Sequence, residues 1–142
     1  MGQQQLLLII LGVIVVGIAV AVGITMFNDS AVSANRDAVT RDLVNLAARA
    51  QEYYRRPVSL GGGGKTFAKL TVANGMALLT RTSDPSKMTN GNGVFTISTA
   101  GDATAVELTG MGNETGNDPT KKVTVVMQVW ADSAKVDQTK TN

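Results

Sequence analysis

An uninterrupted apolar segment near the N-terminus is the strongest constraint on this chain. Leu6 to Phe27 reads LLLIILGVIVVGIAVAVGITMF, twenty-two residues without a charge, with Thr25 as the only polar side chain. As an α-helix this segment would be about 33 Å long, which is enough to cross the hydrocarbon core of a bilayer. A helix that is apolar on all sides must be surrounded by lipid or by other apolar helices. The chain therefore needs an apolar environment for this segment.

Three interpretations of the segment are open. A cleaved secretory signal peptide would use Ala19-Val20-Ala21 as its cleavage site, but Met1–Gln5 carries no Lys or Arg and the apolar run is longer than an h-region. A single-span anchor for an external domain is a second interpretation. In the third, which we favour, the helix leaves the membrane and becomes part of the packed core of a helical filament.

A second helical pattern follows directly after the polar residues Asn28, Asp29 and Ser30. Residues 29–56 contain neither proline nor glycine, and their apolar residues recur at steps of three, four and seven, which places them on one stripe of a helix. Pro57 ends this helix because the residue before a proline is disfavoured in the α region. Without a break at Asn28–Ser30, a single helix of about 80 Å would run from Gln3 to Arg56. The residues expected to pack against a sheet are Val39, Leu43, Leu46, Ala50 and Tyr53.

The C-terminal region is predicted to form a small antiparallel sheet after the glycine connector at 61–64 and a helical turn at 65–70. Apolar and polar residues alternate at 94–98, 103–109 and 123–130, and a weaker strand is expected at 77–80. Short connections between strands favour antiparallel pairing. The predicted fold is therefore α+β, with the long helix covering one face of a sheet of three or four strands. The expected divisions are an apolar half-helix at 1–28, an amphipathic half-helix at 29–56, a β-domain at 57–131 with a polar loop at 110–122, and a loose tail at 132–142.

The composition argues against catalysis and against nucleic-acid binding. The chain has no cysteine and no histidine, which removes thiolate chemistry and the commonest general base. Its net charge is +2, and the basic residues are dispersed rather than clustered. We expect no enzyme and no cofactor. An alternative to a solvated loop is a weak calcium site formed by oxygens of Glu114, Asn117 and Asp118.

This arrangement resembles the type IV pilin-like superfamily, which includes type IV pilins, secretion pseudopilins and archaeal filament proteins. The resemblance covers an uncharged N-terminal helix, its amphipathic continuation and a small antiparallel sheet laid on it. It implies that the subunit waits in the inner, cytoplasmic membrane and then assembles into an extracellular surface filament. The implied partners are further copies of the chain, the membrane before assembly and an assembly machinery, with no requirement for nucleic acid. The implied function is a pilus-like structural subunit for adhesion or motility; the alternatives are a secretion pseudopilin and a non-polymerising anchored binding domain.

The resemblance also assigns roles within the helix. Members of the family usually have a leader ending in glycine and a glutamate at the fifth mature position. Gly2 would then be the last leader residue, or Met1 would be the first mature residue, which aligns Gln5 with that glutamate. The segment Gln3, Gln4 and Gln5 can form hydrogen bonds in a filament core without burying a charge. The family's proline in the first helix has no counterpart here, and Gly17 and Gly23 are the positions for comparable local unwinding. The expected filament-core residues are Leu6, Leu7, Ile9, Ile10, Val13, Ile14, Val16, Gly17 and Val20.

Overall fold

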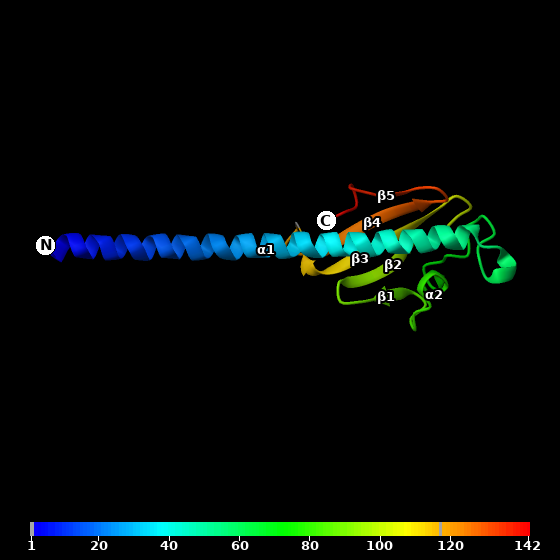
Figure 1. Ribbon diagram of the computed structural model, residues 1–142, viewed down its shortest axis with the longest axis horizontal. Coiled ribbons are helices and arrows are strands. Elements are labelled where there is room, and N and C mark those ends of the chain that lie inside the picture. The colour runs from blue at the N-terminus through cyan, green and yellow to red at the C-terminus, as the bar shows by residue number, and fades with distance from the viewer. Residues whose placement is uncertain (1, 117) are drawn as a thin grey trace.

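A computed structural model of the chain describes residues 2–116 and 118–142. One long helix carries a small sheet on its C-terminal half, while its N-terminal half projects away from the sheet (Figure 1). This confirms the α+β fold. The elements are α1 (Gly2–Arg55), the 3₁₀ turn η1 (Val58–Leu60), α2 (Gly75–Thr80), β1 (Lys87–Thr89), β2 (Gly93–Thr99), β3 (Ala105–Thr115), β4 (Lys122–Trp130) and β5 (Ala134–Val136).

Helix α1 continues without a break through the polar residues Asn28–Ser30. The Ser30 hydroxyl donates to the carbonyl of Met26 at 2.9 Å, so this side chain is satisfied within the helix and does not interrupt it. The helix has 54 residues and a length of about 80 Å. It ends at Arg55, two residues before Pro57, as the restriction on residues preceding proline predicts.

The sheet contains five antiparallel strands in the order β1-β2-β3-β4-β5, rather than the three or four expected. Each strand pairs with its neighbour in sequence, with Phe95 opposite Gly110 between β2 and β3, for example. The weak strand expected at 77–80 is wrong, because these residues belong to α2. Met76 and Leu79 are both buried, and their spacing of three residues is that of a helix face. Residues 65–70 form only a turn, in which the Leu70 amide donates to the Phe67 carbonyl at 2.8 Å.

Strand β3 extends to Thr115, so much of the region expected to be a polar loop at 110–122 is strand. Glycines in this strand lie where α1 crosses it. A Cβ atom on Gly110 would lie 2.6 Å from Cγ1 of Val39 and 2.9 Å from the ring of Phe95. The missing side chain therefore permits a close approach of helix and sheet, which explains why a residue type typical of turns occurs within a strand.

The C-terminal segment is docked on the sheet, and the prediction of a loose tail at 132–142 is wrong. Strand β5 pairs with β4, with Val136 opposite Met127. Further along, the backbone amide of Asn142 donates to the carbonyl of Thr124 at 2.9 Å. Backbone hydrogen bonds to the edge of β4 hold this segment, so it needs no apolar periodicity of its own.

The core lies between the C-terminal half of α1 and the inner face of the sheet. Helix α1 packs over β3 and β4. The five helix residues assigned to this packing, Val39, Leu43, Leu46, Ala50 and Tyr53, are all buried and belong to one hydrophobic cluster with β2, β3 and β4. The opposing sheet residues include Phe95, Ile97, Leu108, Val123, Val125 and Val129.

Polar side chains on α1 bind the loop between β1 and β2 and the end of β3. The Asn35 amide donates to the carbonyl of Asn92 at 3.0 Å, and its oxygen accepts from the backbone amide of Asn113 at 3.1 Å. The Asp42 carboxylate accepts from the side-chain amides of Asn90 and Asn92, both at 2.8 Å. These contacts fix the end of the sheet nearest to the projecting half of α1.

Candidate functional site: an exposed apolar half-helix

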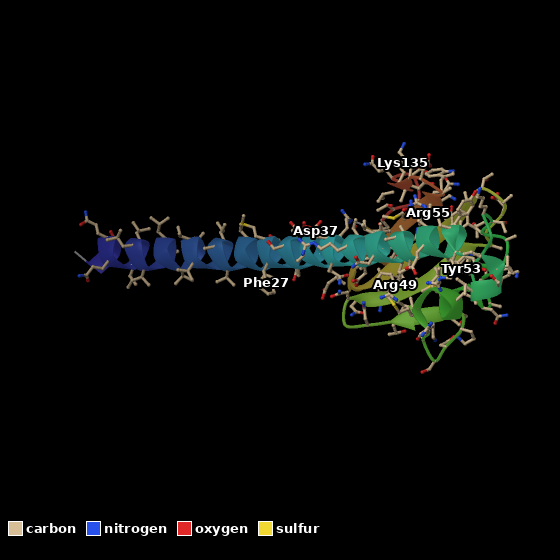
Figure 2. All side chains as sticks on the ribbon, turned by 45° about the vertical axis from the view of Figure 1, so that its right-hand side comes forward. Phe27, Asp37, Arg49, Tyr53, Arg55 and Lys135 are labelled. Atoms are coloured by element: carbon tan, nitrogen blue, oxygen red, sulfur yellow. The ribbon has the colours of Figure 1, made fainter. Side chains whose placement is uncertain are left out.

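The N-terminal half of α1 is covered by no other part of the described chain. Every residue from Gly2 to Ser30 is exposed, and the first fully buried residue of the helix is Val39. The exposed half extends about 43 Å from the folded domain (Figure 2). The eight large side chains expected in a filament core have 53–67 % of their surface exposed, and Gly17 is exposed as well. These eight side chains are Leu6, Leu7, Ile9, Ile10, Val13, Ile14, Val16 and Val20.

The predicted filament-core residues form only part of the exposed apolar surface of α1. Eight further large apolar side chains in the same segment have 50–74 % of their surface exposed. These residues could have been predicted from the sequence by their position in an unbroken apolar run. A helix formed by such a run has no polar face that could be assigned to solvent. The additional residues are Leu8, Leu11, Val15, Ile18, Val22, Ile24, Met26 and Phe27.

The exposed half of α1 contains few polar groups that need water as a hydrogen-bond partner. The hydroxyl of Thr25 donates to the carbonyl of Val22 at 2.8 Å, and that of Ser30 donates to Met26. A buried hydroxyl without a partner is costly, whereas one bonded to its own helix is compatible with an apolar environment. Among the described residues Asp29 is the first charged side chain. This surface is therefore suited to lipid or to packing against apolar helices.

The helix is also long and apolar enough to cross a membrane, by length and composition. The core helix of a globular protein can pass the same test, but such a helix is mostly buried. None of the most apolar window of α1 is buried within the described chain. Its position near the N-terminus is also that of a signal sequence, as the first of the three interpretations requires.

Glycines and glutamines in this half have no partners among residues 2–116 and 118–142. A Cβ atom added at Gly12, Gly17 or Gly23 would meet nothing within 4 Å. The subunit is helical through Gly17 and Gly23, so local unwinding stays a prediction for the assembled state. The side chains of Gln3–Gln5 make no hydrogen bond to any described residue, and they are exposed at the end of the helix.

Of the three residues considered for calcium, Asn117 lies outside the described residues, and the two carboxylates lie apart from the apolar half-helix. Glu114 is in strand β3 rather than in a loop. One oxygen of Asp118 accepts from the Thr120 hydroxyl at 2.6 Å and from its amide at 3.0 Å, and these bonds lower the pKa of Asp118. Its other oxygen lies 3.5 Å from the Lys121 ammonium. Within residues 2–116 and 118–142, no group of three or more acidic, histidine or cysteine side chains is placed to hold a metal ion.

No protein-family model, curated protein or solved structure matches this chain. The class of this protein is therefore defined by its fold and its exposed apolar surface alone. The chain is an α+β protein in which one helix packs on an antiparallel sheet and continues as an exposed apolar segment long enough to span a membrane. This architecture is compatible with a pilin-like fold.

Proposed function

We propose that this protein is the structural subunit of a helical surface filament that serves adhesion or motility. In this proposal the apolar half of α1 anchors the subunit in the cytoplasmic membrane and then packs against the same half of other copies. The observation that carries the proposal is the complete exposure of residues 2–30 on a helix continuous with a folded domain. An apolar surface of this size requires an environment that the subunit does not supply.

The energetics favour a filament that persists once it has formed. Sixteen large apolar side chains between Leu6 and Phe27 are at least half exposed. Full burial of one such side chain is worth about 1.5–3 kcal/mol, so release of the segment into water would cost tens of kcal/mol. Transfer from lipid to a helix bundle gains little, because both environments are apolar. An assembly machinery would therefore have to drive extraction, while dissociation into water would be strongly opposed.

The shape of the subunit favours open helical symmetry. The folded domain covers only one end of a helix about 80 Å long, so copies can stagger along their helices while their domains form an outer layer. A head-to-tail contact of this kind generates a helical filament when its rotation does not close into a ring.

The length of the apolar run also supports a second candidate, a single-span anchor for a domain that never polymerises. A pseudopilin of a type II-like secretion system is a variant of the first proposal, in which the assembly is short.

Shearing cells that produce the full chain, and imaging the supernatant by electron microscopy, tests these proposals. Long fibres with a central layer of helices are the expected result. Short fibres that form only on overexpression would indicate a pseudopilin. If the protein is recovered only from the membrane fraction, as single subunits in detergent, the filament proposal is wrong and the anchored domain is favoured.

A further inference from the structure

A pocket of about 370 Å³ lies between the C-terminal part of α1 and helix α2, far from the exposed half-helix. Helix α1 contributes Arg49, Glu52 and Tyr53 to its walls. Arg56 follows directly after α1, and Arg81 lies at the end of α2. Figure 2 shows Arg49 and Tyr53 on the part of α1 that carries the folded domain. Three guanidinium groups and one carboxylate therefore line a single cavity.

Two of these guanidinium groups have no acidic partner among the described residues. Arg56 forms an ion pair with Glu52, which neutralises both residues. Arg49 donates to the carbonyl of Leu79 at 3.4 Å, and this bond turns its side chain toward α2. Within the described parts of the chain, neither Arg49 nor Arg81 forms a salt bridge. The pocket consequently presents two exposed positive charges that no carboxylate of the described residues balances.

Tyr53 adds an unused polar group. Only 3 % of this residue is exposed, and its hydroxyl makes no hydrogen bond to any residue that the structure describes. Burial raises the pKa of Tyr53, so the hydroxyl stays protonated at neutral pH and keeps its proton for donation. The Tyr53 ring is buried, but its hydroxyl oxygen is not among the buried side-chain atoms that lack a partner, so it reaches the surface and is open to an acceptor in the pocket.

The backbone at Arg81 supports a role for its side chain. Arg81 ends α2 in the left-handed conformation, with φ 53° and ψ 34°, and its amide donates to the carbonyl of Ala77. Glycine is the usual residue at such a helix terminus because it adopts this conformation without a steric cost. An arginine here is not explained by the backbone, and its side chain lies at the wall of the pocket.

We propose that this pocket binds a small ligand carrying a carboxylate or phosphate group. The guanidinium groups of Arg49 and Arg81 would donate to the oxyanion, and the Tyr53 hydroxyl would supply a further donor. Guanidinium groups form strong, charge-assisted hydrogen bonds with both kinds of oxyanion. The volume lies at the lower end of the range of about 300–1,000 Å³ for ligand pockets, which suits a small solute.

Calorimetric titration of the full chain in detergent micelles tests this inference, with sodium phosphate and sodium acetate as probes at constant ionic strength. We expect saturable binding in the millimolar range. Arg81→Gly removes the guanidinium group while suiting the left-handed backbone, and Arg49→Gln removes the second donor. Each variant should weaken binding at least about tenfold, as expected for the loss of a charged hydrogen-bond donor.

Arg55→Gln is the matched control, because Arg55 is on the same helix but donates to the carbonyl of Ala131 outside the pocket. This variant should bind as the unmodified chain does. Tighter binding of phosphate than of acetate would assign a phosphate ligand, and the reverse order a carboxylate; either supports the proposal. The proposal fails if neither probe binds beyond the level of chloride, or if Arg55→Gln weakens binding as much as Arg81→Gly. Unfolding curves of each variant check that the domain remains folded.

Discussion

Replacement of Ile14 by aspartate tests the proposed role of the exposed half-helix most directly. Ile14 lies within the apolar run, about 12 Å along the helix from Leu6 and about 20 Å from Phe27. A short carboxylate side chain cannot reach water past either end of this run. The position is also about 37 Å along the helix from Val39, the first fully buried residue, so the change should leave the folded domain unaltered.

The size of the effect of Ile14→Asp follows from the cost of placing a charge in an apolar environment. A charged residue at the centre of a membrane helix costs about 2.5–3.5 kcal/mol, while each Leu, Ile, Val or Phe contributes about −0.3 to −0.6 kcal/mol. The remaining apolar residues of the segment should therefore still insert the helix into the membrane. In a filament core every subunit would carry the charge, and the same cost corresponds to a loss of about 100-fold in the equilibrium constant for adding each subunit.

The assay compares sheared filaments with the membrane fraction in cells that produce Ile14→Asp or the control Ile14→Ala. We expect Ile14→Asp to be present in the membrane and absent from filaments, and Ile14→Ala to form filaments. Circular dichroism of the purified variants should show the same folded domain. Filaments of normal yield and length from Ile14→Asp would refute the reasoning.

Three further predictions concern the folded domain. Gly110→Val should lower the free energy of unfolding by about 1–3 kcal/mol through overpacking against Val39, measured by denaturant titration with tryptophan fluorescence; Gly91→Ala, where a Cβ atom meets nothing within 4 Å, should have little effect. Asn35→Ala should cost about 1–2 kcal/mol and increase hydrogen exchange in the loop at 90–92 and at the end of β3, because its side-chain amide binds Asn92 and Asn113. Glu107→Gln should flatten the acid dependence of stability, because the hydrogen bond from Lys140 lowers the pKa of Glu107 below its ordinary value of 4.5.

The direction of the pH effect follows from linkage. The carboxylate of Glu107 accepts from the Lys140 ammonium at 2.7 Å and from the hydroxyls of Ser98 and Thr99. Since its pKa is lowered in the folded state, its stabilising contribution is present above the ordinary glutamate pKa and is lost as the pH falls through the folded-state value. Glu114→Gln, at an exposed glutamate, is the control. Equal pH profiles for Glu107→Gln and the unmodified chain would contradict this assignment.

The main features of the fold were predictable because they depend on local periodicity. The helix runs through residues 2–55, and the alternating segments at 94–98 and 123–130 lie within β2 and β4. The short strands β1 and β5 could not be predicted in this way. Three-residue strands have too few side chains to show a period, and they exist because a neighbouring strand supplies their backbone partners.

Glycine was the main source of error within the sheet. Gly110 and Gly112 were interpreted as part of a loop, because glycine is depleted in strands. Both are buried in β3, where α1 approaches the strand backbone. The distance between helix and sheet depends on how the two pack, so the sequence of β3 alone does not reveal why these positions lack a side chain.

The exposed half-helix and the pocket between α1 and α2 also differ in how far the sequence alone predicts them. The apolar run from Leu6 to Phe27 determines from sequence alone that this chain needs lipid or partner helices, because no arrangement of one helix can shield all of its own sides. Only the tertiary structure decides that the run stays fully exposed on a helix continuous with the folded domain. Only the tertiary structure, too, brings Arg81 to Arg49 and Tyr53, since packing α2 against α1 joins residues that are distant in sequence and share no periodicity.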